Sequence, residues 1–342
     1  MPPVKRSNRE RGVALLTMLL IAALATVLVT TIIERQSRVQ RELAGELQLD
    51  QVAQYNQGAA LFAMAALRED GRQGMLVDHP GEGWAQPFPP FPVPGGLILP
   101  ALSDAQARFN LNSLVRAGST NEAALFFMRR LLSQLLLPTE LADSLVDWLD
   151  ADSQPFSAAG AEDDFYLRLD VPYRAANRPL STYDELRLVR GFTGDTLRAL
   201  SPFVTVLPAA ASKMNVNFIA PPILEALVPG LAPASAVELL KTRPTEGWKT
   251  LAEFLNNPVF NGVSQEVRAA LGALLDVRSR YFELYTRVRF GDRERLQWTL
   301  IARRPSRLPD VIAVERDPSV VPDIEPPPNS DDEPLEEQEE VQ

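Results

Sequence analysis

Residues 5–33 read KRSNRERGVALLTMLLIAALATVLVTTII, in which basic residues lead directly into an unbroken apolar run. Residues 13–33 carry no charge, and this stretch is long enough for a helix to cross a hydrocarbon layer of about 30 Å. Basic residues before such a stretch predict that the amino terminus stays inside and that the rest of the chain lies outside. The segment therefore predicts a single-pass membrane protein whose first element is a helix.

The apolar run continues into a polar but periodic stretch. Val39, Leu43 and Leu47 repeat at helical spacing, and neither proline nor glycine interrupts residues 13–44. We therefore predict one long helix over 13–68, with residues 13–33 in the membrane and the remainder packed on a globular body. The same three residues form an apolar stripe that is suited to partner helices.

The composition excludes several classes of enzyme. The 342 residues include no cysteine and one histidine, His79, which rules out thiolate chemistry and multi-histidine metal centres. Phosphate-binding, dinucleotide-binding and nucleophile-elbow motifs are absent from the sequence as well. We expect neither catalytic residues nor an organic cofactor.

The net charge of −10 is concentrated at one end of the chain. Residues 309–342 hold twelve acids and one base, so the rest of the chain is close to neutral. A near-neutral body lacks the many basic residues that a nucleic-acid groove requires, and we expect no nucleic-acid partner. The acidic, proline-rich segment 309–342 is predicted to be a disordered tail.

Two segments predict a small antiparallel sheet. Tyr281–Phe290 alternates aromatic or branched residues with polar ones, Gly291 and Asp292 form a turn, and residues 296–302 return with the same pattern. This hairpin defines a region over 277–308, and a Pro/Gly-rich linker with further strands is expected over 69–102. The fold class is then α+β, a long helix packed on a small antiparallel sheet.

Between these sheet regions we predict a large helical insertion in two parts, 103–212 and 213–276. Ser119 with Glu122, and Thr182 with Glu185, have the spacing of capping boxes. Two short helices joined around Gly230 resemble a SAM-like or helix-hairpin-helix module. The hairpin has no second glycine and no nearby base, so we interpret it as structural or as a protein contact.

An acidic cluster, residues 147–164, begins in the last turn of a helix expected at 140–150 and continues into the acidic loop that follows it. Its alternating oxygen donors suit a hard cation such as calcium, and later carboxylates would complete the shell. Pro155 and Ala161 depart from an EF-hand, and a solvated acidic loop remains the alternative. Two carboxylates for glycoside hydrolysis could be drawn from this loop, but such enzymes usually also line the cleft with aromatic side chains. The candidate ligands are Asp150, Asp152, Gln154, Glu162 and Asp163.

The amino-terminal pattern of Arg11, Gly12 and Val13 before the apolar helix resembles the leader of type IV pilins and type II secretion pseudopilins. The resemblance implies that a prepilin peptidase removes residues 1–12 and methylates Val13. An uncleaved single-pass anchor remains the alternative.

Two further features resemble the K-type minor pseudopilins of type II secretion systems. The fifth mature position is Thr17, where most pseudopilins carry glutamate, and the body is about twice the usual size. The stretch WLDADSQP (148–155), the later GAED (160–163) and PYRAAN (172–177) are similar to the segment where that family binds calcium.

This resemblance implies an assembly protein rather than an enzyme. It would sit in the inner membrane with its body in the periplasm, and start or cap the pseudopilus that exports folded proteins. Its partners would be the I- and J-type minor pseudopilins, with Thr17 and the stripe of Val39, Leu43 and Leu47 engaged in assembly. The remaining alternatives are an uncleaved periplasmic scaffold and, less favoured, a calcium-dependent hydrolase.

Overall fold

A computed structural model describes residues 8–74, 77–208, 212–290, 293–304 and 307–318. The chain divides into two compact units, Met1–Tyr55 and Asn56–Gln342. Residues 1–7 of the expected leader lie outside the described ranges.

The first element, α1 (Asn8–Gly74), is one continuous helix that extends the predicted 13–68 at both ends. Within it, Leu15–Gln40 has a mean hydropathy of 2.5 and is long and apolar enough to span a membrane. The helix continues past Leu67 because the following residues are polar without proline, and Arg72 pairs with Glu69 one turn earlier at 3.4 Å.

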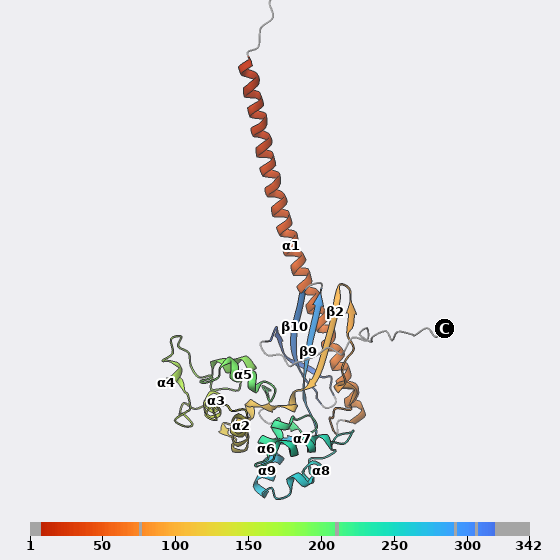
Figure 1. The fold of residues 1–342 in the computed structure, drawn as a ribbon, viewed down its shortest axis with the longest axis vertical. Coiled ribbons are helices and arrows are strands. Elements are labelled where there is room, and N and C mark those ends of the chain that lie inside the picture. The colour runs from red at the N-terminus through yellow and green to blue at the C-terminus, as the bar shows by residue number, and fades with distance from the viewer. Residues whose placement is uncertain (1–7, 75–76, 209–211, 291–292, 305–306, 319–342) are drawn as a thin grey trace, which may run out of the picture. The chain divides into compact units, whose positions relative to one another are not determined.

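The predicted antiparallel sheet is present and has five strands in the order β1-β2-β9-β10-β11 (Figure 1). The expected hairpin is confirmed, since Tyr281 pairs with Ala302 and Phe290 with Arg293. β9 also pairs with β2, from Gly96 opposite Phe290 to Asp104 opposite Phe282. The strands are β1 (Phe91–Val93), β2 (Gly96–Asp104), β9 (Tyr281–Phe290), β10 (Arg293–Ala302) and β11 (Asp310–Arg316).

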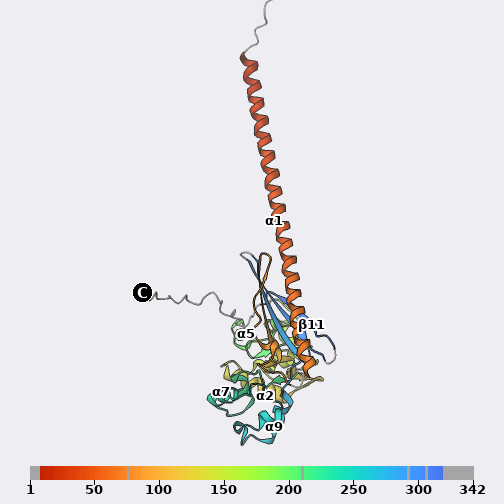
Figure 2. The same cartoon turned by 90° about the vertical axis from the view of Figure 1, so that its right-hand side faces the viewer.

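The last turns of α1 pack on this sheet within the second unit (Figure 2). The Phe62 ring meets the rings of Phe88 and Phe91 edge-on, with centroids 5.1 Å and 5.2 Å away. Ala63 and Leu67 on the same helix are fully buried. The α+β prediction of a long helix on a small antiparallel sheet is therefore confirmed.

The boundary predicted for the acidic tail was wrong, because residues 310–316 form the edge strand β11. Val311 pairs with Ile301 and Glu315 with Trp298 of β10, with an irregular register between Leu300 and Ile301. The segment DVIAVER contains three β-branched residues, Val311, Ile312 and Val314, which favour a strand, but the charge count over 309–342 drew attention only to its acids. Residues 319–342, the rest of the predicted tail, lie outside the described part of the chain.

The helical insertion leaves the sheet after β2 and returns at β9. Its apolar residues form one large core that includes Phe109, Trp148, Leu224 and Phe254. Short strand pairs, β3 (Phe109–Asn110) with β6 (Val204–Thr205), β4 (Val115–Arg116) with β5 (Ser119–Thr120), and β7 (Met214–Asn215) with β8 (Leu275–Asp276), connect the helices. The helices are α2 (Glu122–Gln134), α3 (Leu141–Leu149), α4 (Asp163–Tyr166), α5 (Gly194–Leu200), α6 (Pro221–Leu227), α7 (Pro233–Lys241), α8 (Leu251–Leu255) and α9 (Gln265–Leu274).

The two capping boxes predicted in the insertion were wrong, because neither Ser119 nor Thr182 caps a helix. Ser119 belongs to β5, so the chain enters α2 two residues later and the Asn121 side chain accepts the cap bond from the Ala124 amide. Thr182 precedes a 3₁₀ helix and makes no side-chain cap. Glu185 instead accepts from the Ser181 amide at 2.9 Å and from the Trp148 indole at 3.1 Å.

Candidate metal site in the acidic loop

The acidic loop begins where helix α3 ends. All nine residues of α3 are buried, and Leu145 and Trp148 belong to the core of the insertion. The helix ends at Leu149, and Asp150 leaves it in an extended conformation. The end of α3 at Leu149 therefore determines where Asp150, the first of the predicted ligands, lies.

Two further acids of α3 hold the loop in a folded shape. Both Asp147 carboxylate oxygens accept backbone amides of the loop, from Phe156 at 2.7 Å and from Ala161 at 2.6 Å. Asp143 accepts from the Ser157 hydroxyl at 2.7 Å and pairs with Arg129 at 2.6 Å. The Asp143 and Asp147 carboxylates are therefore engaged by hydrogen bonds and an ion pair within the protein, and they hold the loop in place.

Glycine is required where the loop comes back to the helix. A Cβ at Gly160 would lie 2.1 Å from Asp147 Oδ2, well inside contact distance. The carbonyl of Gly160 accepts from the Arg190 guanidinium at 2.9 Å. This close approach places Glu162 beside the end of α3.

The fold brings three of the predicted ligands together. One carboxylate oxygen from each of Asp150, Asp152 and Glu162 lies within 4.8 Å of the others. Asp152 is exposed, whereas Glu162 is only 3% exposed. Asp150 Oδ1 and both Glu162 oxygens are buried with no hydrogen-bond partner among the residues that the structure describes.

Asn177, which was not among the predicted ligands, contacts the backbone of the loop at Asp152. Asn177 donates from its side-chain amide to the Asp152 carbonyl at 2.9 Å, and its own Oδ1 is buried without a partner in the described chain. Its φ of 46° is in the left-handed region, which asparagine tolerates better than most residues. The only signal in the sequence was its place at the end of PYRAAN (172–177), and that pattern does not say which residue Asn177 approaches.

Two other predicted ligands stand apart from this group. Asp163 uses one oxygen to pair with Arg174 at 3.0 Å and the other to accept the Ala175 amide at 3.0 Å. Gln154 is exposed, and its backbone amide donates to Asp152 Oδ1 at 2.8 Å.

The electrostatics of the group favour a cation. Burial, together with repulsion from Asp147, Asp150 and Asp152, raises the pKa of Glu162 to about 7. Burial likewise raises the pKa of Asp150 to about 6, with Asp152 as the main repelling neighbour. Buried oxygen donors that lack partners and repel one another are the chemistry that a hard divalent ion satisfies.

A second acidic group, Asp70, Asp78 and Glu82, also has carboxylate oxygens within 4.8 Å of one another. The Arg303 guanidinium already pairs with both aspartates and stacks over the Phe282 ring at 4.8 Å. Because the Arg303 guanidinium already neutralises two of these carboxylates, the group is better described as an internal ion-pair network than as a metal site.

The predicted processing and assembly residues all lie in α1. Gly12 and Val13 are helical, and nothing of their side chains is described. Thr17 is exposed and Val39 is 46% exposed, whereas the side chains of Leu43 and Leu47 fall outside the description.

Comparisons with known proteins agree along most of the chain. Sequence profiles of the family "Type II secretion system (T2SS), protein K" match residues 107–209 and 214–278. The type II secretion system protein K of Pseudomonas aeruginosa is 37% identical over 305 residues, covering 86% of this chain and 89% of that protein. That of Pectobacterium carotovorum is 34% identical, covering 86% and 93%.

A solved structure shares the fold. It is a chain of the GspK-GspI-GspJ complex from the type 2 secretion system of enterotoxigenic Escherichia coli. The TM-score is 0.74 at 31% identity, and the match covers 81% of this chain and all of that one.

Proposed function

The chain belongs to the type II secretion system protein K family, and we propose that it assembles with I- and J-type minor pseudopilins at the tip of the pseudopilus. Members of this family are structural pseudopilins rather than enzymes. The observation that carries the proposal is the match to the chain in the GspK-GspI-GspJ complex, which covers that chain completely.

The proposed place of the chain is the inner membrane, crossed once by Leu15–Gln40 with the body in the periplasm. Support comes from the apolar helix and from the basic residues before it. Cleavage by the prepilin peptidase falls between Gly12 and Val13, where the basic leader meets the apolar run. The mature chain then begins within α1.

Calcium is the proposed structural ion of the acidic loop. Support comes from the carboxylates of Asp150, Asp152 and Glu162 and the side-chain oxygen of Asn177, a purely oxygen donor set. Bound calcium would supply positive charge that offsets the repulsion among these acids. Asp147 and Asp143 hold the loop through its amides and the Ser157 hydroxyl, so the ion would set the positions of 150–162 relative to α3.

Co-purification tests the proposed assembly. The full chain is expressed with the I- and J-type pseudopilins of the same system, and a tag on one of them should retrieve this chain in a stable complex. Deletion of the gene should block release of folded substrates from the periplasm. Retrieval of the I–J pair without this chain, together with normal secretion in the deletion strain, would contradict the proposal.

A further inference from the structure

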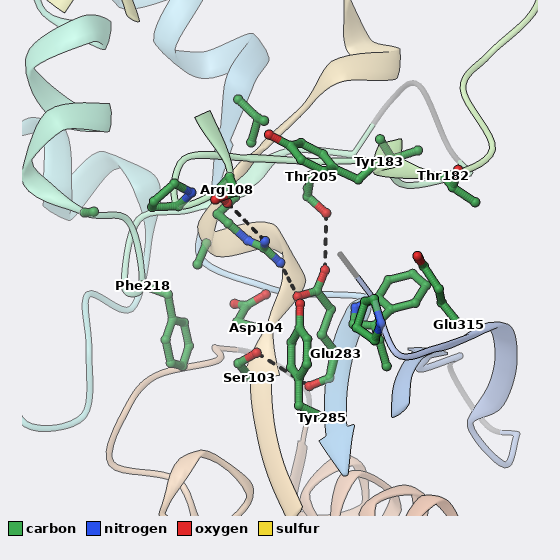
Figure 3. A pocket seen from close by; sticks show the side chains of 18 of the residues that line it. Ser103, Asp104, Arg108, Thr182, Tyr183, Thr205, Phe218, Glu283, Tyr285 and Glu315 are labelled. Atoms are coloured by element: carbon green, nitrogen blue, oxygen red, sulfur yellow. Dashed lines mark hydrogen bonds and ion pairs between the residues drawn. The ribbon is translucent and has the colours of Figure 1, made fainter. Parts of the chain in front are cut away.

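A pocket lies between the sheet and the helical insertion, within the second unit (Figure 3). Its volume is about 520 Å³, within the ~300–1,000 Å³ range of ligand pockets. β2, β9, β10 and β11 contribute one side, and the segments around 181–183 and 201–206 contribute the other. Aromatic walls come from Tyr183, Phe218, Tyr285 and Trp298.

The charged groups of the pocket are largely satisfied by one another. Arg108 pairs with the buried Glu283, and the Thr205 hydroxyl donates to Glu283 at 3.4 Å (Figure 3). Asp104 and Glu315 add further acid to the lining. Because Arg108 is neutralised and acids outnumber bases in the lining, the pocket disfavours an anionic ligand, and its aromatic walls favour an apolar one.

The end of the described chain reaches this pocket. β11 pairs with β10 up to Arg316, and Pro318, two residues later, is itself a lining residue. The next residues along the sequence, Val320, Val321 and Pro322, are apolar, and acids begin at Asp323. Three extended residues span at most about 11 Å, so the chain after Pro318 is long enough for this apolar group to reach the pocket.

We propose that residues 319–322, at the start of the carboxy-terminal segment, dock into this pocket, with Val320, Val321 and Pro322 against the aromatic walls. Proline-rich chains suit aromatic-lined grooves, because they lose little conformational entropy on binding. Attachment at Pro318 holds the segment at an effective concentration in the millimolar range, so even a weak fit fills the pocket. The acids from Asp323 onward stay in solvent, away from the acidic lining.

The absence of cysteine from the sequence allows a direct test in the full-length protein in detergent micelles. Val321→Cys and Thr182→Cys place one thiol in the segment and one at the exposed rim of the pocket. A disulfide needs the two Cα atoms within about 7 Å, so its rate of formation under a mild oxidant measures docking.

Two matched variants in this background separate docking from mere proximity. Val320→Asn removes an apolar contact and should slow cross-linking by about tenfold, equivalent to ~1.4 kcal/mol of lost apolar burial. Val341→Asn makes the same change outside the docking segment, near the end of the sequence, and should leave the rate unchanged.

Equal rates for both variants and the parent would overturn the proposal, because a freely moving segment is indifferent to Val320. A second measurement uses the chain without added cysteines. Val320→Asn should increase acrylamide quenching of tryptophan fluorescence, since Trp298 lines the pocket. Unchanged quenching would mean that the pocket is open or holds another molecule, and this also overturns the proposal.

Discussion

Glu162 combines deep burial with several acidic neighbours, and this combination makes the acidic loop testable one residue at a time. Its two oxygens have no partner among the described residues, and repulsion adds to burial in raising its pKa to about 7. A metal-free loop is therefore strained by this charge, whereas a cation would convert the same charge into a stabilising interaction.

The first prediction uses Glu162→Gln, which removes the charge and keeps the shape. With chelator, the variant should melt at the same temperature as the parent or higher, because the repulsion is relieved. With excess calcium the parent should melt higher than with chelator, by a linkage increment that the variant largely loses. Differential scanning calorimetry of the full chain measures both effects.

Asp164→Asn is the matched control for that prediction, since the Asp164 carboxylate is 94% exposed and pairs with Arg168 at the surface. It should leave both melting temperatures close to the parent values. A calcium increment that survives Glu162→Gln undiminished would exclude Glu162 as a ligand.

The second prediction concerns pH. The unfolded glutamate titrates near 4.5, whereas folded Glu162 titrates near 7, so the metal-free fold loses stability as pH rises through this window. The difference in Tm between calcium and chelator should thus be larger at pH 8 than at pH 5. Glu162→Gln should flatten the dependence, and an equal difference at both pH values would contradict the expected ligand set.

For single residues, the sequence predicts which types of side chain form the metal site better than it predicts which of these residues come together in the fold. The alternation of Asp150 and Asp152 and the later Glu162 can be recognised in one dimension. Two facts depend on the fold and were not predictable: Asp163 is taken by Arg174 and the Ala175 amide, and Asn177 approaches Asp152 from 25 residues away.

At the scale of elements, Arg303 joins the end of β10 to the last turns of α1. Its side chain is 3% exposed, pairs with Asp70 and Asp78, and donates to the Ser279 carbonyl at 3.0 Å. Sequence periodicity predicts both elements but not this contact, because the partners are more than 200 residues apart. Strand β11 was missed for a different reason, because its acidic residues were counted as part of the predicted tail.

The third prediction is that Arg303→Met destabilises the fold strongly. It leaves Asp70 and Asp78 as acids without their cation, and breaking a buried pair in this way costs about 3–5 kcal/mol. Arg304→Gln is the neighbouring control, since Arg304 pairs with Asp310 where both side chains are 48% exposed, and such pairs contribute about 0–1 kcal/mol. Denaturant unfolding followed by circular dichroism compares them, and equal midpoints would contradict the role assigned to Arg303.

The fourth prediction concerns the start of α1. Gly12→Ala should block removal of the leader, because the family's peptidase requires the smallest residue before the cut. Mass spectrometry of the chain isolated from cells with the peptidase should give a methylated Val13 terminus for the parent and an intact leader for the variant. An intact leader in the parent itself would favour the uncleaved anchor.

At the scale of the whole molecule, the insertion between β2 and β9 makes this subunit bulky, which fits a single copy at the end of a filament. The sequence predicted this organisation because each part has its own local signal: the apolar run, the β9–β10 hairpin and the buried helix stripes. The pairing of β2 with β9 was not predictable, since the intervening chain carries no information about which strand returns beside which.

The fifth prediction follows from that position. Thr17 stands where most pseudopilins carry glutamate, and a buried carboxylate in hydrocarbon is costly without a partner. Thr17→Glu should give no gain in assembly or secretion. Photo-crosslinking from position 17 should capture other minor pseudopilins, and regular cross-links between copies of this chain would contradict the tip position.

The pairing of β2 with β9 also has a consequence for the order of folding. Ser103 and Glu283 lie opposite each other although 180 positions separate them in sequence. Closing a loop of that size as a flexible coil costs conformational entropy, and contacts so distant in sequence form slowly. The β9–β10 hairpin needs no such closure. We therefore expect the insertion to condense first, bringing its two ends within one strand spacing, and the pairing of β2 with β9 to form last.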